Sequence, residues 1–231
     1  MIDLDAYFKR IGFPGARAPS LEALDGIVLR HVKSIPFENL DVLLGRPIDL
    51  DDAAIQKKLI HEKRGGYCFE QNTLLLAVLK QLGFEARPLS ARVRYQRPRD
   101  FTPARTHLLI RVEVDGVARL ADVGAGAMSP TKSLTLDELG SQVTPHETRR
   151  LLRENGLIYH QALLGSQWAE SASSRSKKCR SSIASSRICT PARTLIRTFA
   201  TSCWSHAPPM TEAASPFSTV SSRFETARVM R

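Results

Sequence analysis

The chain has 231 residues, 42% of them hydrophobic, and a formal net charge of +10, which suits one large globular domain or two small ones. The positive charge is concentrated at the end of the chain: residues 166–231 hold 10 of the 33 Lys and Arg residues but only 3 of the 23 Asp and Glu. Because most of the excess charge lies outside the part with folded patterning, we expect no nucleic-acid partner.

The chain contains no run of about 18 apolar residues, so the sequence predicts no membrane span and no membrane partner. Its N-terminus begins with the acidic residues Asp3 and Asp5 and lacks the basic and apolar regions of a secretory signal. We therefore expect a cytoplasmic protein, in which a cysteine is catalytic, metal-binding or inert rather than disulfide-bonded.

Residues 1–83 have the apolar spacing of helices and predict a small helical bundle. Gly12 closes a first helix over residues 5–11, and Ser20 caps a second that ends before Pro36. A third helix carries Ile55, Leu59 and Ile60. A fourth runs over residues 68–82 and ends at Gly83.

Residues 84–165 turn to β patterning and predict a small antiparallel sheet or barrel, so the fold class is α+β. A strand is expected over residues 86–95. Residues 107–114 and 117–123 flank Asp115-Gly116, a strong signal for a two-residue hairpin turn. A further hairpin is expected around Asn155-Gly156.

Residues 166–231 differ in character, with 15 of the 21 serines, three of the four cysteines and no aspartate. No helical or strand period persists there. Two interpretations stay open: a disordered basic Ser/Arg-rich tail, or a reading-frame shift that replaced a folded C-terminal portion. The spacing of the cysteines with His206 is too irregular for a metal site, so no metal is expected (Cys179, Cys189 and Cys203).

Cys68 is the first candidate for chemistry, because it follows Gly65-Gly66 and falls in the first turn of the predicted fourth helix. Unpaired backbone N–H groups and the positive end of the helix dipole stabilise a thiolate there, and the same N–H groups can hold an oxyanion. Position alone also fits a buried structural cysteine.

The predicted hairpin brings His107 and Asp122 together. If Asp115 and Gly116 form a two-residue loop, Leu109 pairs with Asp122, and His107 points to the same face two residues away. The two residues are then diagonal neighbours about 7–8 Å apart, within reach of their side chains. A carboxylate in that position orients an imidazole and stabilises its cation.

Four motifs resemble those of the arylamine N-acetyltransferase family, in order and spacing over residues 1 to about 165. They are Arg64-Gly65-Gly66-Tyr67-Cys68-Phe69-Glu70-Gln71-Asn72, Ile35-Pro36-Phe37-Glu38-Asn39-Leu40, Arg105-Thr106-His107-Leu108-Leu109 and Leu120-Ala121-Asp122-Val123-Gly124-Ala125-Gly126. The resemblance implies a helical bundle, a β-barrel and an α/β lid, with a catalytic triad of Cys68, His107 and Asp122.

The resemblance also implies the surroundings of the triad. Phe37 and Val93 would line the substrate pocket, and the loop of Gly124, Ala125 and Gly126 would approach the acyl donor. Glu38 and Arg64 would form a structural ion pair near the nucleophile.

The chain departs from the family pattern in two places. Ala125 stands where the family usually has a bulky residue between the two glycines, which would widen the acceptor pocket. Nothing after residue 165 resembles the lid, which helps to cover the cleft and bind coenzyme A.

The resemblance favours ping-pong transfer of an acetyl group from acetyl-CoA to an arylamine or hydrazine, through an acetyl-cysteine at Cys68. Two alternatives stay open. Papain-like hydrolases and transglutaminases use the same residue types in this chain order, so the acyl group could pass to water or lysine. The chain could also be inactive without its lid. The preferred amine, the acyl-chain length and the oligomeric state are not indicated.

Overall fold

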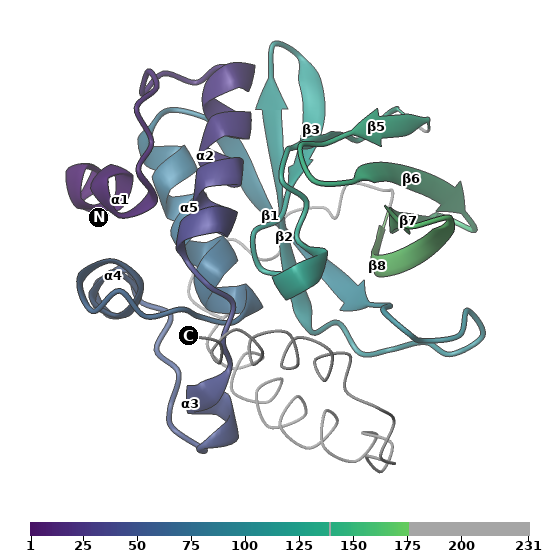
Figure 1. Cartoon of the computed structure of the whole chain (residues 1–231), viewed down its shortest axis with the longest axis horizontal. Helices are drawn as coiled ribbons and strands as arrows, with labels where there is room; N and C mark the ends of the chain where they lie inside the picture. The colour runs from purple at the N-terminus through teal and green to yellow at the C-terminus, as the bar shows by residue number, and fades with distance from the viewer. Residues whose placement is uncertain (139, 176–231) are drawn as a thin grey trace, which may run out of the picture.

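The computed structural model describes residues 1–138 and 140–175. In this part of the chain, helices come first and an antiparallel sheet follows, so the fold mixes helices with an antiparallel sheet (Figure 1). The two interpretations of the C-terminal segment concern residues 166–231, of which residues 176–231 lie outside the described residues.

The helical part runs from the N-terminus to residue 81. Its elements are α1 (Leu4–Ile11), α2 (Leu21–Ser34), α3 (Leu40–Leu43), α4 (Asp52–Gln56), the π-helical turn η1 (Lys57–His61) and α5 (Cys68–Gln81). A short 3-10 turn, η2 (Gly126–Met128), lies later in the chain.

Capping residues set the helix ends where the sequence predicted them. The Ser20 side chain accepts a hydrogen bond from the Ala23 N–H, which satisfies one free donor at the start of α2. The same helix ends at Ser34, and its extended C-cap residue Ile35 precedes a proline. Gly12 adopts φ +64° after α1, a left-handed conformation that glycine reaches without strain. The helix predicted to carry Ile55, Leu59 and Ile60 is α-helical only in its first half, α4. Its second half is the π-helical turn η1.

The strands form one antiparallel sheet in the order β4-β3-β2-β1-β8-β7-β6-β5. Their bounds are β1 (Glu85–Val93), β2 (His107–Val114), β3 (Val117–Ala121), β4 (Leu134–Thr135), β5 (Ser141–Val143), β6 (Thr148–Glu154), β7 (Leu157–Leu164) and β8 (Gln167–Arg175).

The two predicted hairpins are confirmed. Val114 pairs with Val117, and Asp115 and Gly116 adopt φ +50° and +74° in the turn between them. Positive φ at both turn residues matches the twist of the flanking strands, which is why Asp-Gly and Asn-Gly pairs favour such hairpins. Asn155 and Gly156 have nearly the same φ values and join β6 to β7.

The sheet extends past the predicted boundary at residue 165. β8 occupies Gln167–Arg175 and pairs with both β7 and β1, so it lies in the middle of the sheet. These nine residues therefore form a strand although their sequence has no strand period. Their serines and alanines show no alternation, and the register follows from the tight turn at Gly165, which adopts φ +60°.

The sheet curls toward a barrel, and a side chain bridges its two edge strands. Gln142 of β5 accepts a hydrogen bond from the Thr135 N–H of β4 at 2.7 Å, and its Nε2 donates to the Thr135 carbonyl at 3.0 Å. The Gln142 side-chain amide thus bonds the backbone of Thr135 on the edge strand β4, as a neighbouring strand would. The curvature of β6, β7 and β8 is visible in Figure 1.

Two apolar cores lie on opposite faces of the sheet. α5 packs on β1 and β2, and Val78 and Leu79 of α5 belong to the same larger core as Ile110 and Val112 of β2. The smaller core fills the inside of the curled sheet; its buried members are Ala91, Leu109, Ala118, Leu120, Leu134, Leu136, Leu151, Ile158 and Ala172.

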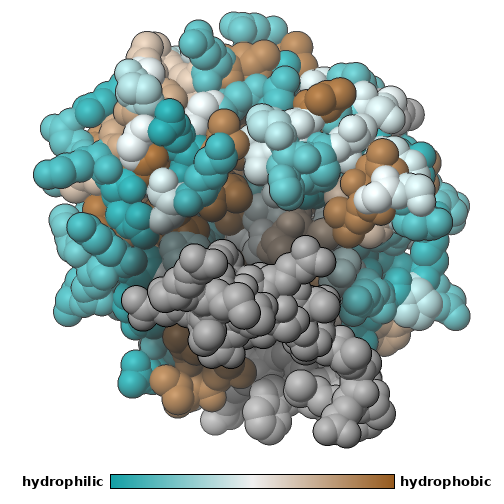
Figure 2. All heavy atoms as spheres, in the orientation of Figure 1, coloured by the Kyte–Doolittle hydropathy of each residue, from teal (hydrophilic) through white to brown (hydrophobic). Residues whose placement is uncertain are grey.

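The short helix α3 was not predicted, and it leaves three leucines more than half exposed: Leu40, Leu43 and Leu44. A brown patch at the lower left of the molecule in Figure 2 lies over this helix. Among the described residues, no helix is long and apolar enough to cross a membrane.

Candidate active site

Cys68 is the first residue of α5, and its side chain is 3% exposed. Its Sγ lies 3.5 Å from the Thr106 carbonyl oxygen, next to the start of β2. The Glu70 carboxylate accepts a hydrogen bond from the Tyr67 N–H at 3.0 Å, which fixes the entry of the chain into the helix. The thiol is thus held against the sheet at the positive end of a 14-residue helix.

His107 and Asp122 meet as the hairpin register predicted. His107 begins β2, Asp122 follows the last residue of β3, and the pairing of Ile110 with Ala121 sets the register between them. The distance from His107 Nε2 to Asp122 Oδ2 is 2.8 Å. Because Nε2 faces the carboxylate, Nδ1 is the ring nitrogen left for the thiol.

Electrostatics favour the charged forms of both groups. Burial lowers the pKa of His107, but the negative charge and hydrogen bond of Asp122, followed by the hydrogen bond and charge of Cys68, raise it overall to about 10. Burial raises the pKa of Asp122, but His107, the Asn72 amide and the Gly124 N–H lower it overall. An imidazolium next to a carboxylate is therefore the resting state near neutral pH.

This pKa predicts how stability changes with pH. A raised folded-state pKa means that charged His107 stabilises the fold fully below about pH 6.5, its ordinary pKa, and that this contribution is lost as the pH rises through 10. We expect the imidazole NMR signal of His107 to titrate far above 6.5 and to move toward lower pH in Asp122→Asn. Titration near 6.5 in the unmodified protein would contradict the ion pair.

Asn72 joins the helix to both strands and was not assigned a role from the sequence. Its Nδ2 donates to Asp122 Oδ1 at 2.9 Å and to the Leu108 carbonyl at 2.8 Å, and its Oδ1 accepts from the Val123 N–H at 3.0 Å. Asn72 is fully buried and lies one turn after Cys68 on α5. That spacing of four residues, which places two side chains on one helix face, was the available signal.

Gly124 packs directly on the nucleophile. A Cβ at this position would lie 2.6 Å from Asn72 Nδ2 and 2.7 Å from the Cα of Cys68. The Gly124 N–H also donates to Asp122 Oδ1 at 2.9 Å. Only glycine lets this loop approach the start of α5 so closely.

We expect Gly124→Ala to lower the free energy of unfolding by about 1–3 kcal/mol, because the new methyl group overpacks a site bounded by backbone. Thermal unfolding measures the effect. Gly140→Ala is the matched control, since a Cβ there meets nothing within 4 Å. Equal melting temperatures for the two variants would show that the approach at Gly124 is not tight.

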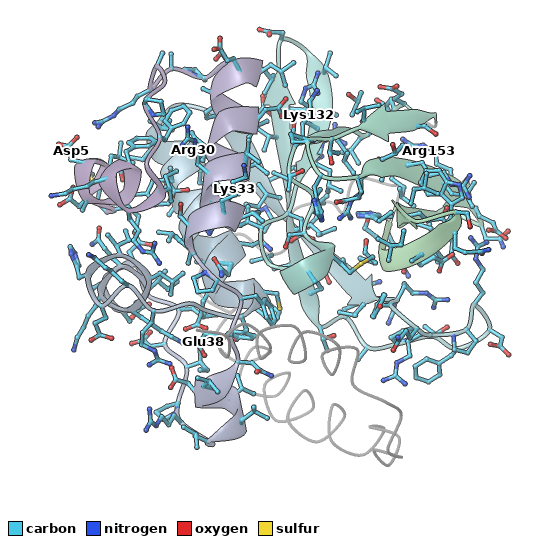
Figure 3. All side chains as sticks on the ribbon, viewed as in Figure 1. Asp5, Arg30, Lys33, Glu38, Lys132 and Arg153 are labelled. Atoms are coloured by element: carbon cyan, nitrogen blue, oxygen red, sulfur yellow. The ribbon has the colours of Figure 1, made fainter. Side chains whose placement is uncertain are left out.

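Glu38 and Arg64 form the pair that the resemblance implied, within a larger cluster of charges. Arg64 Nη2 lies 2.8 Å from both Glu38 and Asp41, and Lys58 Nζ lies 2.8 Å from Asp41 and 2.7 Å from Glu70. Glu38 stands between α2 and α3 (Figure 3). Burial raises the pKa of Asp41, but Lys58 and Arg64 lower it overall to about 2. The cluster joins α3, η1 and the first turn of α5.

The glycine pair before Cys68 is held in place by contacts with residues 35–37 and with α5. Phe37 and Gly66 form a parallel β-bridge, and a Cβ on Gly65 would lie 2.2 Å from the Pro36 carbonyl oxygen. Gln71 of α5 donates to the carbonyls of Pro36 and Gly66. Its Oε1 lies 2.7 Å from His31, whose ring is fully buried. The segment before the nucleophile is thus anchored on both sides.

A cavity of about 410 Å³ opens beside this anchored segment. Phe37, Val123 and Gly126 line it, and the Phe37 side chain remains 42% exposed. A Cβ on Gly126 would lie 3.4 Å from the Phe37 ring. Of the five residues that the resemblance assigns to the substrate pocket or the acyl-donor loop, Phe37 and Gly126 line one cavity. The other three do not border it: Val93, Gly124 and Ala125.

Cys68 does not border this cavity either; its side chain is buried in a small cluster with Tyr67 and Val42. Among residues 1–138 and 140–175, no group of three or more His, Cys, Asp or Glu residues is arranged to hold a metal ion.

Comparison with known proteins identifies the family. A family model described as N-acetyltransferase matches residues 20–198. The chain is 45% identical over 151 residues to an arylamine N-acetyltransferase of Escherichia coli, which covers 65% of this chain and 53% of that protein. It is 43% identical over 172 residues to the Mycobacterium tuberculosis protein of the same name, covering 72% and 60%.

Solved structures of such proteins share the fold. An M. smegmatis arylamine N-acetyltransferase superposes with a TM-score of 0.75 at 38% identity, covering 85% of this chain and 70% of that one. The Mycobacterium marinum protein in complex with CoA gives 0.75 at 36% identity, covering 84% and 69%. The match with the Escherichia coli protein spans about half of that protein's length, 53%. With the family model, the relatives and the fold in agreement, the chain belongs to the arylamine N-acetyltransferase family.

Proposed function

We propose that this chain transfers an acetyl group from acetyl-CoA to arylamines or hydrazines through an acetyl-cysteine at Cys68. The observation that carries the proposal is the buried thiol at the start of α5 beside a His107–Asp122 pair at 2.8 Å. The names of the relatives, which are arylamine N-acetyltransferases, and the CoA complex of a structural neighbour support the choice of substrates.

In the first half-reaction, His107 holds the proton of Cys68, so the resting pair is a thiolate and an imidazolium. The thiolate attacks the carbonyl carbon of the acetyl-CoA thioester. Backbone N–H groups in the first turn of α5 stabilise the oxyanion. The carbon–sulfur bond to coenzyme A then breaks, and His107 gives its proton to the departing sulfur. Asp122 keeps the ring oriented throughout.

In the second half-reaction, the amine nitrogen attacks the acetyl-cysteine carbonyl, and neutral His107 accepts the amine proton. The bond to Sγ breaks, and the thiolate–imidazolium pair returns. An aromatic amine suits this step because its weakly basic nitrogen carries no proton at pH 7. The cavity beside Phe37 is the proposed place for the aromatic ring, since an aromatic wall favours an aromatic ligand.

We also propose the finer architecture of the family for this chain: a helical bundle over residues 1–83 and a β-barrel that carries His107 and Asp122. The sheet order and the bridge between its edge strands support the barrel. The α/β lid that the family implies would lie outside the described residues. The cytoplasmic location remains a prediction.

The test is coenzyme A release from acetyl-CoA, measured by thiol detection with and without an arylamine. We expect a burst of about one equivalent per chain without amine and continuous turnover with amine, because the acetyl-enzyme accumulates until an acceptor arrives. Hydrolysis of peptides or modification of glutamine, with no coenzyme A release, would instead support the hydrolase or transglutaminase alternative.

A further inference from the structure

A second cavity, of about 430 Å³, lies on the outer face of β1 and β8, away from the cavity beside Phe37. Three arginines line it: Arg92 from β1, Arg105 from the loop before β2, and Arg175 at the end of β8. Within residues 1–138 and 140–175, no Asp or Glu residue lines this cavity, and none of the three arginines forms an ion pair with a carboxylate.

The strand register explains how the arginines meet. Arg92 of β1 pairs with Ser173 of β8, so their side chains point to the same face of the sheet. Arg175 lies two residues further along β8 and shares that face. Arg92 donates a hydrogen bond to the Pro103 carbonyl, which ties the loop that carries Arg105 to β1.

The charges in this cavity repel one another. Burial lowers the pKa of Arg92, and the positive charges of Arg105, Arg175 and Arg94 lower it further. Two acidic residues of the adjoining strands β6 and β8 are engaged with other arginines: Glu170 with Arg94 and Arg99, and Glu154 with Arg99. Cations gathered without a protein counter-charge are stabilised by a bound anion.

We propose that the Arg92–Arg105–Arg175 cavity binds phosphate groups of a polyphosphate ligand. Guanidinium groups match phosphate oxygens with paired hydrogen bonds, and several guanidinium groups suit a diphosphate. The hydroxyls of Ser90 and Thr102 line the same cavity and add neutral donors.

Residues that line the cavity are chain neighbours of residues that contact Cys68 or pair with His107. Arg105 precedes Thr106, whose carbonyl contacts Cys68, and Ala91, between Ser90 and Arg92, pairs with His107. One source of the phosphates is therefore the acetyl donor, because the pantetheine arm separates the thioester of acetyl-CoA from its diphosphate. That source rests on the proposed function. The other source is a free polyphosphate.

The test measures binding of inorganic pyrophosphate by calorimetry at low ionic strength, with the full chain and three variants. We expect Arg92→Gln and Arg175→Gln each to weaken binding about 10-fold or more, because each removes a paired contact to phosphate. The control is Arg30→Gln, which removes the same charge from α2, an element that contributes nothing to this cavity (Figure 3), and should bind as the unmodified chain does.

Absence of pyrophosphate binding in the unmodified chain, or equal weakening in Arg30→Gln, overturns the proposal. If Arg92→Gln does not fold, Arg175→Gln decides alone. Arg175 is exposed and is the last residue of β8, so its replacement should leave the fold intact. The KM for acetyl-CoA and for S-acetylpantetheine distinguishes the sources. If the arginine variants have a raised KM for acetyl-CoA but not for S-acetylpantetheine, the phosphates belong to the donor. If their KM is unchanged for both compounds, the cavity binds a free polyphosphate. Pyrophosphate binding does not depend on acetyl transfer, so a failure of the proposed function would be seen separately.

Discussion

Replacing Cys68 with alanine is expected to lower the rate of acetyl transfer by about 10³-fold or more, because the variant loses the thiol that would carry the acetyl intermediate. Among the described residues, Cys68 is the only cysteine. The measurement is coenzyme A release from acetyl-CoA with an arylamine present. The loss should appear in kcat rather than in KM, since the thiol bonds to the substrate only during the reaction.

Cys68→Ser is the companion variant. Serine has nearly the same size as cysteine and preserves the packing against Val42 and Tyr67, but its hydroxyl is a far weaker nucleophile. Its melting temperature should stay close to that of the unmodified chain while its activity falls with that of the alanine variant. Substantial coenzyme A release by either variant would mean that another residue attacks the thioester.

Asp122→Asn is expected to lower kcat by about 10³–10⁴-fold, the size seen when the orienting carboxylate of a triad becomes an amide. The asparagine oxygen can still accept from Asn72 and the Gly124 N–H, where Asp122 Oδ1 now accepts. Its NH₂ group would then face His107 Nε2 and donate to it. The ring proton would be forced onto Nδ1, the position needed to take the proton of Cys68.

The matched control is Asp115→Asn. Asp115 is an exposed turn residue with φ +50°, a conformation that asparagine adopts as readily as aspartate. It removes the same charge without touching the site, so its kcat should be unchanged. A small loss of activity in Asp122→Asn, comparable to that of the control, would show that the carboxylate does not orient His107.

The His107–Asp122 pair could be predicted because its geometry depends on short-range signals. Asp115-Gly116 fixes a two-residue turn, and the turn fixes the register that places His107 and Asp122 on one face. The position of Cys68 after a glycine pair likewise marks the start of a helix. In each case a few neighbouring residues decide the local structure.

The remaining features depend on contacts between distant segments, which no local pattern reveals. Lys58 reaches Glu70 and Asp41 only because η1 packs beside the start of α5. β8 is a central strand of serines and alanines whose partners, β1 and β7, supply its hydrogen bonds. The arginine cavity requires that same strand, so it could not be predicted while residues after 165 were interpreted as a tail.

The central claim is that Cys68 carries the acetyl group and passes it to an amine. Mass spectrometry after mixing the chain with acetyl-CoA, before and after adding an arylamine, tests it most directly. We predict one added acetyl group on the peptide containing Cys68, and its loss when the amine is added, with formation of the acetylated amine. An unmodified Cys68 peptide together with acetylated amine, or an acetyl group on another residue that the amine removes, would contradict the claim.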